Sequence, residues 1–211
     1  MSPLRVVRGA AALGLALVLG TVARADEADD HLLAGATAYR DGRLDEALVE
    51  FNVALKLGGS REARWYVAVT LAKQQKLVAA LEAFALAGAE APQLADAVLE
   101  YHWATTCYQL HLLACADEHL ERADRQAGPQ LKKQVAAVRE AIALVLAETP
   151  PTGAIDAVLE SARQAQQQQR PALARAFFRE AAALAHRRTD AHGLAEAERV
   201  LSTNPVSKGD P

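Results

Sequence analysis

The segment GATAYRDGRLDEALVEFNVA, Gly35 to Ala54, contains the pattern that decides the fold. Its second half places Ala47, Phe51 and Ala54 at spacings of four and three residues, which puts their side chains on one stripe of a helix. Before this stripe, Gly42 can end a preceding helix because glycine adopts the left-handed conformation at little cost. The spacing therefore predicts two helices joined by a turn at Gly42. Gly35 and the alanines would let these helices approach closely, and Phe51 would fill the space between them.

The same stripe recurs three times along the chain, which indicates an internal repeat. Its later members are Ala80, Phe84 and Ala87, then Ala116, Leu120 and Ala123, and finally Ala174, Phe178 and Ala181. The steps between the first alanines of successive stripes are 33, 36 and 58 residues. A chain with 48 alanines could match the small positions by frequency alone. It would not by chance place three of its four phenylalanines in phase with them.

A helix–turn–helix unit of about 34 residues with these small and aromatic positions resembles the tetratricopeptide repeat. The resemblance implies an all-α fold, an α-solenoid of tetratricopeptide-like repeats with a C-terminal helical extension. Composition agrees, because alanine, leucine, glutamate, glutamine and arginine are strong helix formers and isoleucine occurs only twice. The chain departs from the family's pattern early in its first helices, where His31, Arg64 and Glu100 replace the usual tryptophan.

The sequence predicts four segments. Residues 1–25 combine two separated arginines, a short apolar run and the small-x-small sequence Ala23-Arg24-Ala25, which predicts a signal peptide cleaved after Ala25. An uncleaved N-terminal anchor is the alternative. We expect three repeats in residues 26–128, a helical segment with a degenerate repeat in 129–201, and a disordered tail in 202–211. The mature protein would then be periplasmic or secreted.

Charge and motifs argue against several classes of function. Removal of the three arginines in residues 1–25 changes the net charge from −3 to −6, which does not favour nucleic-acid binding. No later apolar run reaches transmembrane length, so we expect no membrane insertion after cleavage. The sequence contains no Gly-rich phosphate loop, HExxH, GxSxG or CxxC motif. We therefore expect neither a cofactor nor an enzymatic activity.

Two cysteines and two histidines alternate at intervals of four residues: Cys107, His111, Cys115 and His119. One straight helix would spread them over about 18 Å, too far to share a metal ion. In the repeat, however, a turn falls near residues 110–112 and brings Cys107 opposite Cys115. A disulfide across the turn, two buried free thiols and a Cys2His2 zinc or copper site remain as alternatives.

The first helices of stacked pairs line a concave groove that generally binds peptides or protein segments. The face turned toward that groove would carry Leu32, Tyr39, Arg40, Trp65, Val69, Lys73, Tyr101, Thr105, Tyr108 and Gln109. It gathers four of the chain's ten aromatic residues, which anchor interfaces most often. Packing between neighbouring repeats is the other interpretation of these aromatics.

We therefore expect a non-enzymatic protein–protein interaction scaffold or adaptor of the bacterial cell envelope. Its partner would be a protein or peptide, and apolar or aromatic residues on the groove face favour a hydrophobic or extended ligand. One alternative is a self-assembling structural envelope protein, a homo-oligomer whose open array stacks end on end. The other is a metal-handling protein that uses Cys107, His111, Cys115 and His119.

Overall fold

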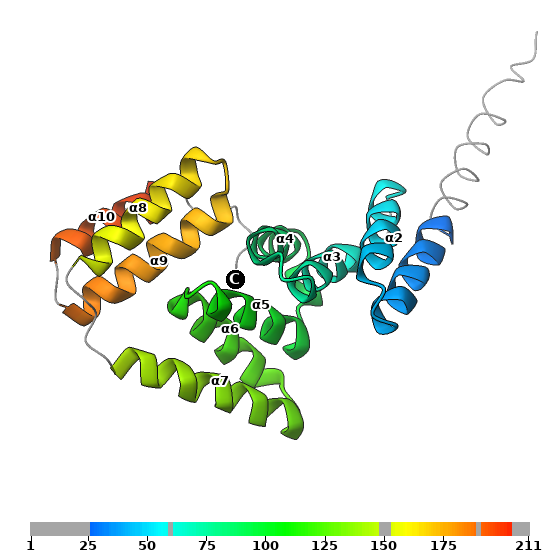
Figure 1. Cartoon of the computed structure of the whole chain (residues 1–211), viewed down its shortest axis with the longest axis horizontal. Coiled ribbons are helices and arrows are strands. Elements are labelled where there is room, and N and C mark those ends of the chain that lie inside the picture. The colour runs from blue at the N-terminus through cyan, green and yellow to red at the C-terminus, as the bar shows by residue number, and fades with distance from the viewer. Residues whose placement is uncertain (1–25, 59–60, 148–152, 189–190, 204–211) are drawn as a thin grey trace, which may run out of the picture. The chain divides into compact units, whose positions relative to one another are not determined.

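A computed structural model describes residues 26–58, 61–147, 153–188 and 191–203 (Figure 1). Every regular element in these ranges is a helix, so the all-α prediction is confirmed. The signal peptide predicted for residues 1–25 lies outside them. A helix over residues 26–40 is followed by α2 (Leu44–Lys56), α3 (Glu62–Lys73), α4 (Leu77–Glu90), the short 3-10 helix η1 (Pro92–Leu94), α5 (Ala97–Gln109), α6 (Leu113–Gln126), α7 (Pro129–Ala147), α8 (Ala154–Gln167), α9 (Pro171–Arg188) and α10 (Ala191–Thr203).

The chain divides into two compact units, with the division between Ala63 and Arg64 near the start of α3. The first unit contains the helix over residues 26–40 and α2. The second contains α4 to α10 together with most of α3. The first unit therefore holds the first copy of the sequence repeat, and the second unit holds the later copies.

In the first unit, the predicted stripe is the contact between the two helices. Ala47, Phe51 and Ala54 on α2 are all fully buried. A Cβ atom on Gly35 would lie 2.6 Å from ring carbons of Phe51, closer than a side chain can approach. Gly35 thus provides the flat surface against which the phenylalanine ring packs, and a larger residue there would force the helices apart.

The turns that join paired helices share one backbone geometry at four places. In the first, the N–H of Arg43 donates to the carbonyl of Ala38 at 2.9 Å, across Gly42 with φ 79°. The same bond, from a residue to the carbonyl five positions earlier, follows three other residues with positive φ, and this is the Schellman pattern of helix ends. Those residues are Gln75 (φ 60°), His111 (φ 58°) and Gln169 (φ 55°).

Each of these four turns has the same buried surroundings. In every case the alanine that starts the stripe lies five residues after the left-handed residue. A small residue lies seven residues before the left-handed residue. The small residues are Gly35, Ala68, Ala104 and Ala162, and all are buried. The repeat is therefore a repeat of backbone conformation and packing as well as of sequence.

Because the turns are equivalent, removing glycine from one and introducing it in another should change the free energy of unfolding in opposite directions. Gly42→Ala is expected to lower the free energy of unfolding by about 1 kcal/mol, because alanine in the left-handed region costs roughly that much. Gln75→Gly removes the same penalty and is expected to raise the free energy of unfolding by up to about 1 kcal/mol. Urea denaturation followed by circular dichroism measures both. A destabilising Gln75→Gly would show that the two turns are not equivalent.

In the second unit, α5 and α6 form a hairpin, and α7 packs on both. The C-terminal segment forms another hairpin, α8 with α9, and α10 packs mainly against α9 (Figure 1). Its core is aliphatic and aromatic, with Ile155, Leu159, Phe178 and Ala197 all at most 5% exposed. Helix α9 also contacts α4 and α6, so the C-terminal hairpin packs on the second helices of the second and third repeats.

Two glutamates attach α9 to its neighbours by capping helix ends. Glu82 on α4 accepts hydrogen bonds from the backbone N–H groups of Ala172 (3.2 Å) and Leu173 (3.1 Å) at the start of α9. In return, Glu180 on α9 accepts one from the N–H of Ala114 (2.7 Å) at the start of α6, which has no side-chain cap of its own. These bonds satisfy donors that a helix cannot satisfy internally. Burial of Glu180 raises the pKa of its carboxyl group.

The described C-terminal helices lie close to the expected bounds of 129 and 201. Helix α7 begins at Pro129, the first residue of the expected C-terminal segment. Helix α10 continues to Thr203, so Ser202 and Thr203 belong to a helix and not to the expected tail. The remainder of that tail, residues 204–211, lies outside the described residues.

Candidate functional site

A stack of buried rings crosses the helices of the second and third repeats. Trp103 on α5 lies between Phe84 on α4, with ring centroids 5.7 Å apart, and His119 on α6, with centroids 3.9 Å apart. Trp65 on α3 meets Trp103 edge-on at 6.1 Å. A Cβ on Gly88 would lie 3.0 Å from the Trp103 ring, so glycine makes room for the indole. Four helices thus share one aromatic core.

The two tryptophans differ in how their N–H groups are satisfied. Nε1 of Trp65 donates to the carbonyl of Ala91 at 3.3 Å. Nε1 of Trp103 is buried and has no hydrogen-bond acceptor within the part of the chain that the structure describes. A buried donor without an acceptor is rare in proteins and unfavourable, so the indole N–H of Trp103 is an unusual polar group in this core.

The histidine of this stack also pairs with a glutamate. Nδ1 of His119 is 2.6 Å from a carboxylate oxygen of Glu100, and both side chains are nearly inaccessible. The first repeat has the reverse pair at equivalent positions, where His31 is 2.6 Å from Glu50 but both side chains remain partly exposed. His31 and Glu100, at equivalent positions of their first helices, therefore form polar contacts between the two helices of a pair.

The structure joins Cys107 at the end of α5 to Cys115 at the start of α6 by a disulfide, with Cα atoms 5.8 Å apart. Both sulfurs are therefore unavailable as thiolate metal ligands. His111 lies exposed in the turn, whereas His119 pairs with Glu100. Among the described residues, no group of three or more histidine, cysteine, aspartate or glutamate side chains could hold a metal ion. The Cys2His2 alternative is thus not formed.

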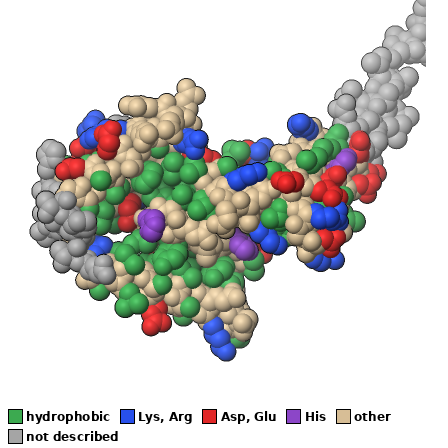
Figure 2. Space-filling view, viewed as in Figure 1, with side chains coloured by type: hydrophobic (Ala, Val, Ile, Leu, Met, Phe, Trp, Pro, Cys, Tyr) green, Lys and Arg blue, Asp and Glu red, His purple; other side chains and the backbone are tan. Residues whose placement is uncertain are grey.

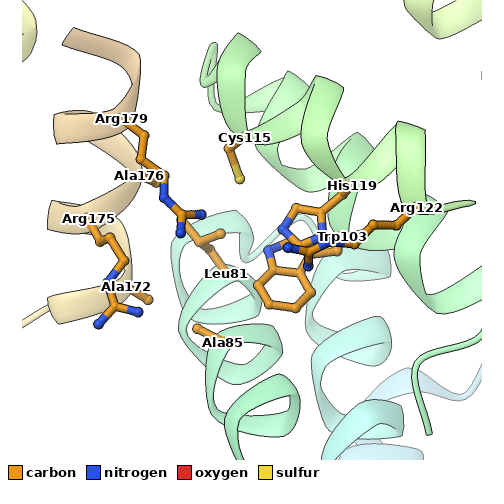
Figure 3. Close-up of a pocket in the computed structure, with 10 residues that line it drawn as sticks. All are labelled: Leu81, Ala85, Trp103, Cys115, His119, Arg122, Ala172, Arg175, Ala176 and Arg179. Atoms are coloured by element: carbon orange, nitrogen blue, oxygen red, sulfur yellow. The ribbon is translucent and has the colours of Figure 1, made fainter. Parts of the chain in front are cut away.

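A pocket of about 50 Å³ lies between α4, α6 and α9, beside Trp103 (Figure 3). Leu81 forms part of its apolar wall, and Cys115 and His119 approach from α6. Arginines line it from two sides: Arg122 from α6, and Arg175 and Arg179 from α9. Figure 3 shows the nitrogen-bearing edge of Trp103 turned toward the side from which Arg179 approaches. No acidic residue lines the pocket within the described part of the chain.

Glu118 holds two of these arginines together at the rim. Arg122 donates to one of its carboxylate oxygens at 2.6 Å, and Arg179 donates to the other at 3.0 Å. Arg122 and Arg179 are 23% and 36% exposed, so the pocket reaches the protein surface. The bridge to Glu118 spans α6 and α9, and it depends on the docking of the C-terminal hairpin.

The residues predicted to line a groove are divided between core and surface. Trp65 and Val69 are buried, at 2% and 5% exposure, and cannot line an open groove. Their placement follows the alternative interpretation, packing between repeats. The other predicted residues are accessible: Leu32, Tyr39, Tyr101, Thr105 and Tyr108 are half-buried, and Arg40, Lys73 and Gln109 are exposed. Leu32, Tyr39 and Arg40 belong to the first unit, and the rest belong to the second.

No pattern in the sequence predicted the pocket. Its charged residues come from α6 and α9, which are more than 40 residues apart along the chain, and no local pattern pairs them. The only signal was the i, i+4 spacing of Arg175 and Arg179, which places both on one face of a helix. That spacing is common on solvated surfaces and does not by itself indicate a site.

Compared with family models, curated proteins and solved structures, the chain matches none of them. None of the described helices has the length and apolar character needed to cross a membrane.

Proposed function

We propose that the protein is a non-enzymatic scaffold or adaptor of the bacterial cell envelope, built on tetratricopeptide-like repeats, that binds a protein partner. The observation that carries the proposal is the same turn at Gly42, Gln75, His111 and Gln169, each with its buried small residue and stripe. Helix pairs repeated in this way present extended surfaces, and proteins that use them generally bind peptides or protein segments.

The accessible face of α5 is the best candidate for the partner's binding surface. Tyr101, Thr105 and Tyr108 follow one another at spacings of four and three residues, so they share one face of the helix. The opposite face is buried through Glu100, Trp103 and Cys107. Half-buried tyrosines bring large, rigid contact area with little loss of side-chain entropy, which is why they recur at protein interfaces.

Location in the envelope is part of the proposal. It is motivated by the signal-peptide pattern of residues 1–25 and by the Cys107–Cys115 disulfide. Disulfides persist in the periplasm and outside the cell but are rare in reducing compartments. Export would therefore be required for this bond to form and to last.

Site-specific crosslinking in the native cells tests the binding surface. A photo-crosslinking amino acid at Thr105 is expected to trap one defined partner, whereas the same amino acid at Leu86, exposed on α4, is the matched control. Tyr101→Ala together with Tyr108→Ala is expected to reduce recovery of that partner by at least about tenfold. Equal adducts at Thr105 and Leu86, or recovery unchanged in the double variant, would contradict the proposal.

Self-assembly is a second candidate, favoured by α7. This helix leaves Leu144 69% exposed and Val145 48% exposed near its end, and Figure 2 shows hydrophobic side chains over α7 and the helices beside it. Apolar side chains this exposed often mark an interaction surface. Sedimentation velocity at rising concentration distinguishes the candidates: growing assemblies that Leu144→Glu abolishes would support self-assembly, and a monomer throughout would exclude it.

A further inference from the structure

The pocket between α4, α6 and α9 has a chemistry of its own, separate from the partner-binding face of α5. We infer that it binds a small oxyanion, a carboxylate or phosphate group, between Trp103 and the arginines of α6 and α9. The inference goes beyond the proposed scaffold function and does not depend on it. Three features of the pocket carry it: an unsatisfied buried donor, arginines that line it from two helices, and a volume matched to a small anion.

The unsatisfied donor is the indole N–H of Trp103. The side chain is 8% exposed, and its Nε1 has no acceptor among the described residues. The equivalent group of Trp65 does have an acceptor, the carbonyl of Ala91. Folding thus buries one indole donor with a partner and the other without, and the one without lies at the pocket. An oxygen acceptor bound there would satisfy it.

The charge around this donor is positive. Arg122, Arg175 and Arg179 line the pocket, and none of the described residues that line it is acidic. Glu118 bridges Arg122 and Arg179 at the rim and offsets part of the charge of these two guanidinium groups. A guanidinium has five N–H groups, so Arg122 and Arg179 retain donors beyond those that bind Glu118. Guanidinium groups recognise carboxylate and phosphate oxygens in a planar, bidentate manner.

The size and walls of the pocket select a small ligand. A volume of about 50 Å³ is several times the roughly 10–15 Å³ that one water molecule requires. Leu81, Ala85 and Ala176 form apolar walls, and in such surroundings the attraction between arginine and an anion is stronger than in water. Glu100, the partner of His119, is not among the residues that line the pocket. A single oxyanion group fits this arrangement.

Nuclear magnetic resonance of the two indole N–H groups tests the inference in the intact protein. Inorganic phosphate or acetate, added at constant ionic strength, is expected to shift the Trp103 indole signal in a saturable way, with half-saturation at or below about 10 mM. The Trp65 indole signal is the internal control and is expected to stay in place, because its donor is already bonded. A response to acetate alone identifies a carboxylate ligand, and a response to phosphate alone identifies a phosphate ligand.

Two variants complete the test. Arg179→Gln is expected to weaken the binding of the responsive anion by about tenfold, since it removes a charged donor from the pocket. Arg163→Gln on α8, where the arginine pairs with Glu160 and Glu196 at the surface, is the matched control and is expected to leave binding unchanged. A Trp103 signal that neither anion moves, that chloride moves equally, or that responds unchanged in Arg179→Gln would overturn the inference.

Discussion

Replacing Phe84 with alanine is expected to lower the free energy of unfolding by about 3–5 kcal/mol, the usual result of truncating a buried phenylalanine. Phe84 is fully buried and stacks on Trp103, with ring planes inclined by 11°, and it also contacts Trp65. Its removal would leave a cavity between two indole rings that cannot close without moving three helices. Trp fluorescence during urea denaturation reports the change directly, because both tryptophans adjoin the site.

Leu86 on the same helix provides the matched control for Phe84. It lies two residues further along α4 but is 49% exposed. Leu86→Ala is therefore expected to change the free energy of unfolding by less than about 0.5 kcal/mol. Similar losses for the two variants would mean that the ring stack does not carry the stability of the second unit.

Replacing Glu100 with alanine is expected to lower the free energy of unfolding by about 3 kcal/mol. The change leaves the buried Nδ1 of His119 without its hydrogen-bond partner and opens a cavity beneath the ring stack. Circular dichroism during urea denaturation measures the loss. Because His119 stacks on Trp103, the same variant is also expected to alter tryptophan fluorescence in the folded state.

Glu50→Ala is the control for Glu100→Ala, since it removes the glutamate of the equivalent pair in the first repeat. His31 and Glu50 are 32% and 26% exposed, so water can replace the lost contact. The expected loss is below about 1 kcal/mol, as for other accessible pairs. Equal effects of the two substitutions would show that burial does not distinguish these pairs.

The helices and their pairing could be predicted from sequence because the signals are local. Ala47, Phe51 and Ala54 are spaced at helical intervals, and Gly42 marks the turn before them, all within about 20 residues. The later turns have Gln75, His111 and Gln169 at the left-handed position, which no composition rule would select. Each lies five residues before the alanine that starts a stripe, but only the turn near residues 110–112 was expected from the sequence. The tetratricopeptide resemblance itself remains a prediction.

Exposure of the groove residues could be predicted only in part. Helical periodicity places Trp65, Val69 and Tyr101 on outward faces of their helices, but it does not say which neighbouring helix covers each face. In the structure, Phe84 and Trp103 surround Trp65, while Tyr101 stays accessible. Large apolar side chains fill gaps wherever tertiary packing leaves them, so burial at these positions is a property of the assembly of helices.

By itself the sequence determined the all-α class, the phase of the helix pairs and the small residues at which they meet, because these depend on spacings within one unit. Only the tertiary structure decided that α9 packs on α4 and α6, through Glu82 and Glu180 and the bridge at Glu118. That docking brings arginines from α6 and α9 to the unsatisfied indole of Trp103. Contacts between segments so far apart leave no periodic trace, since each side chain alone has the spacing of an ordinary surface residue.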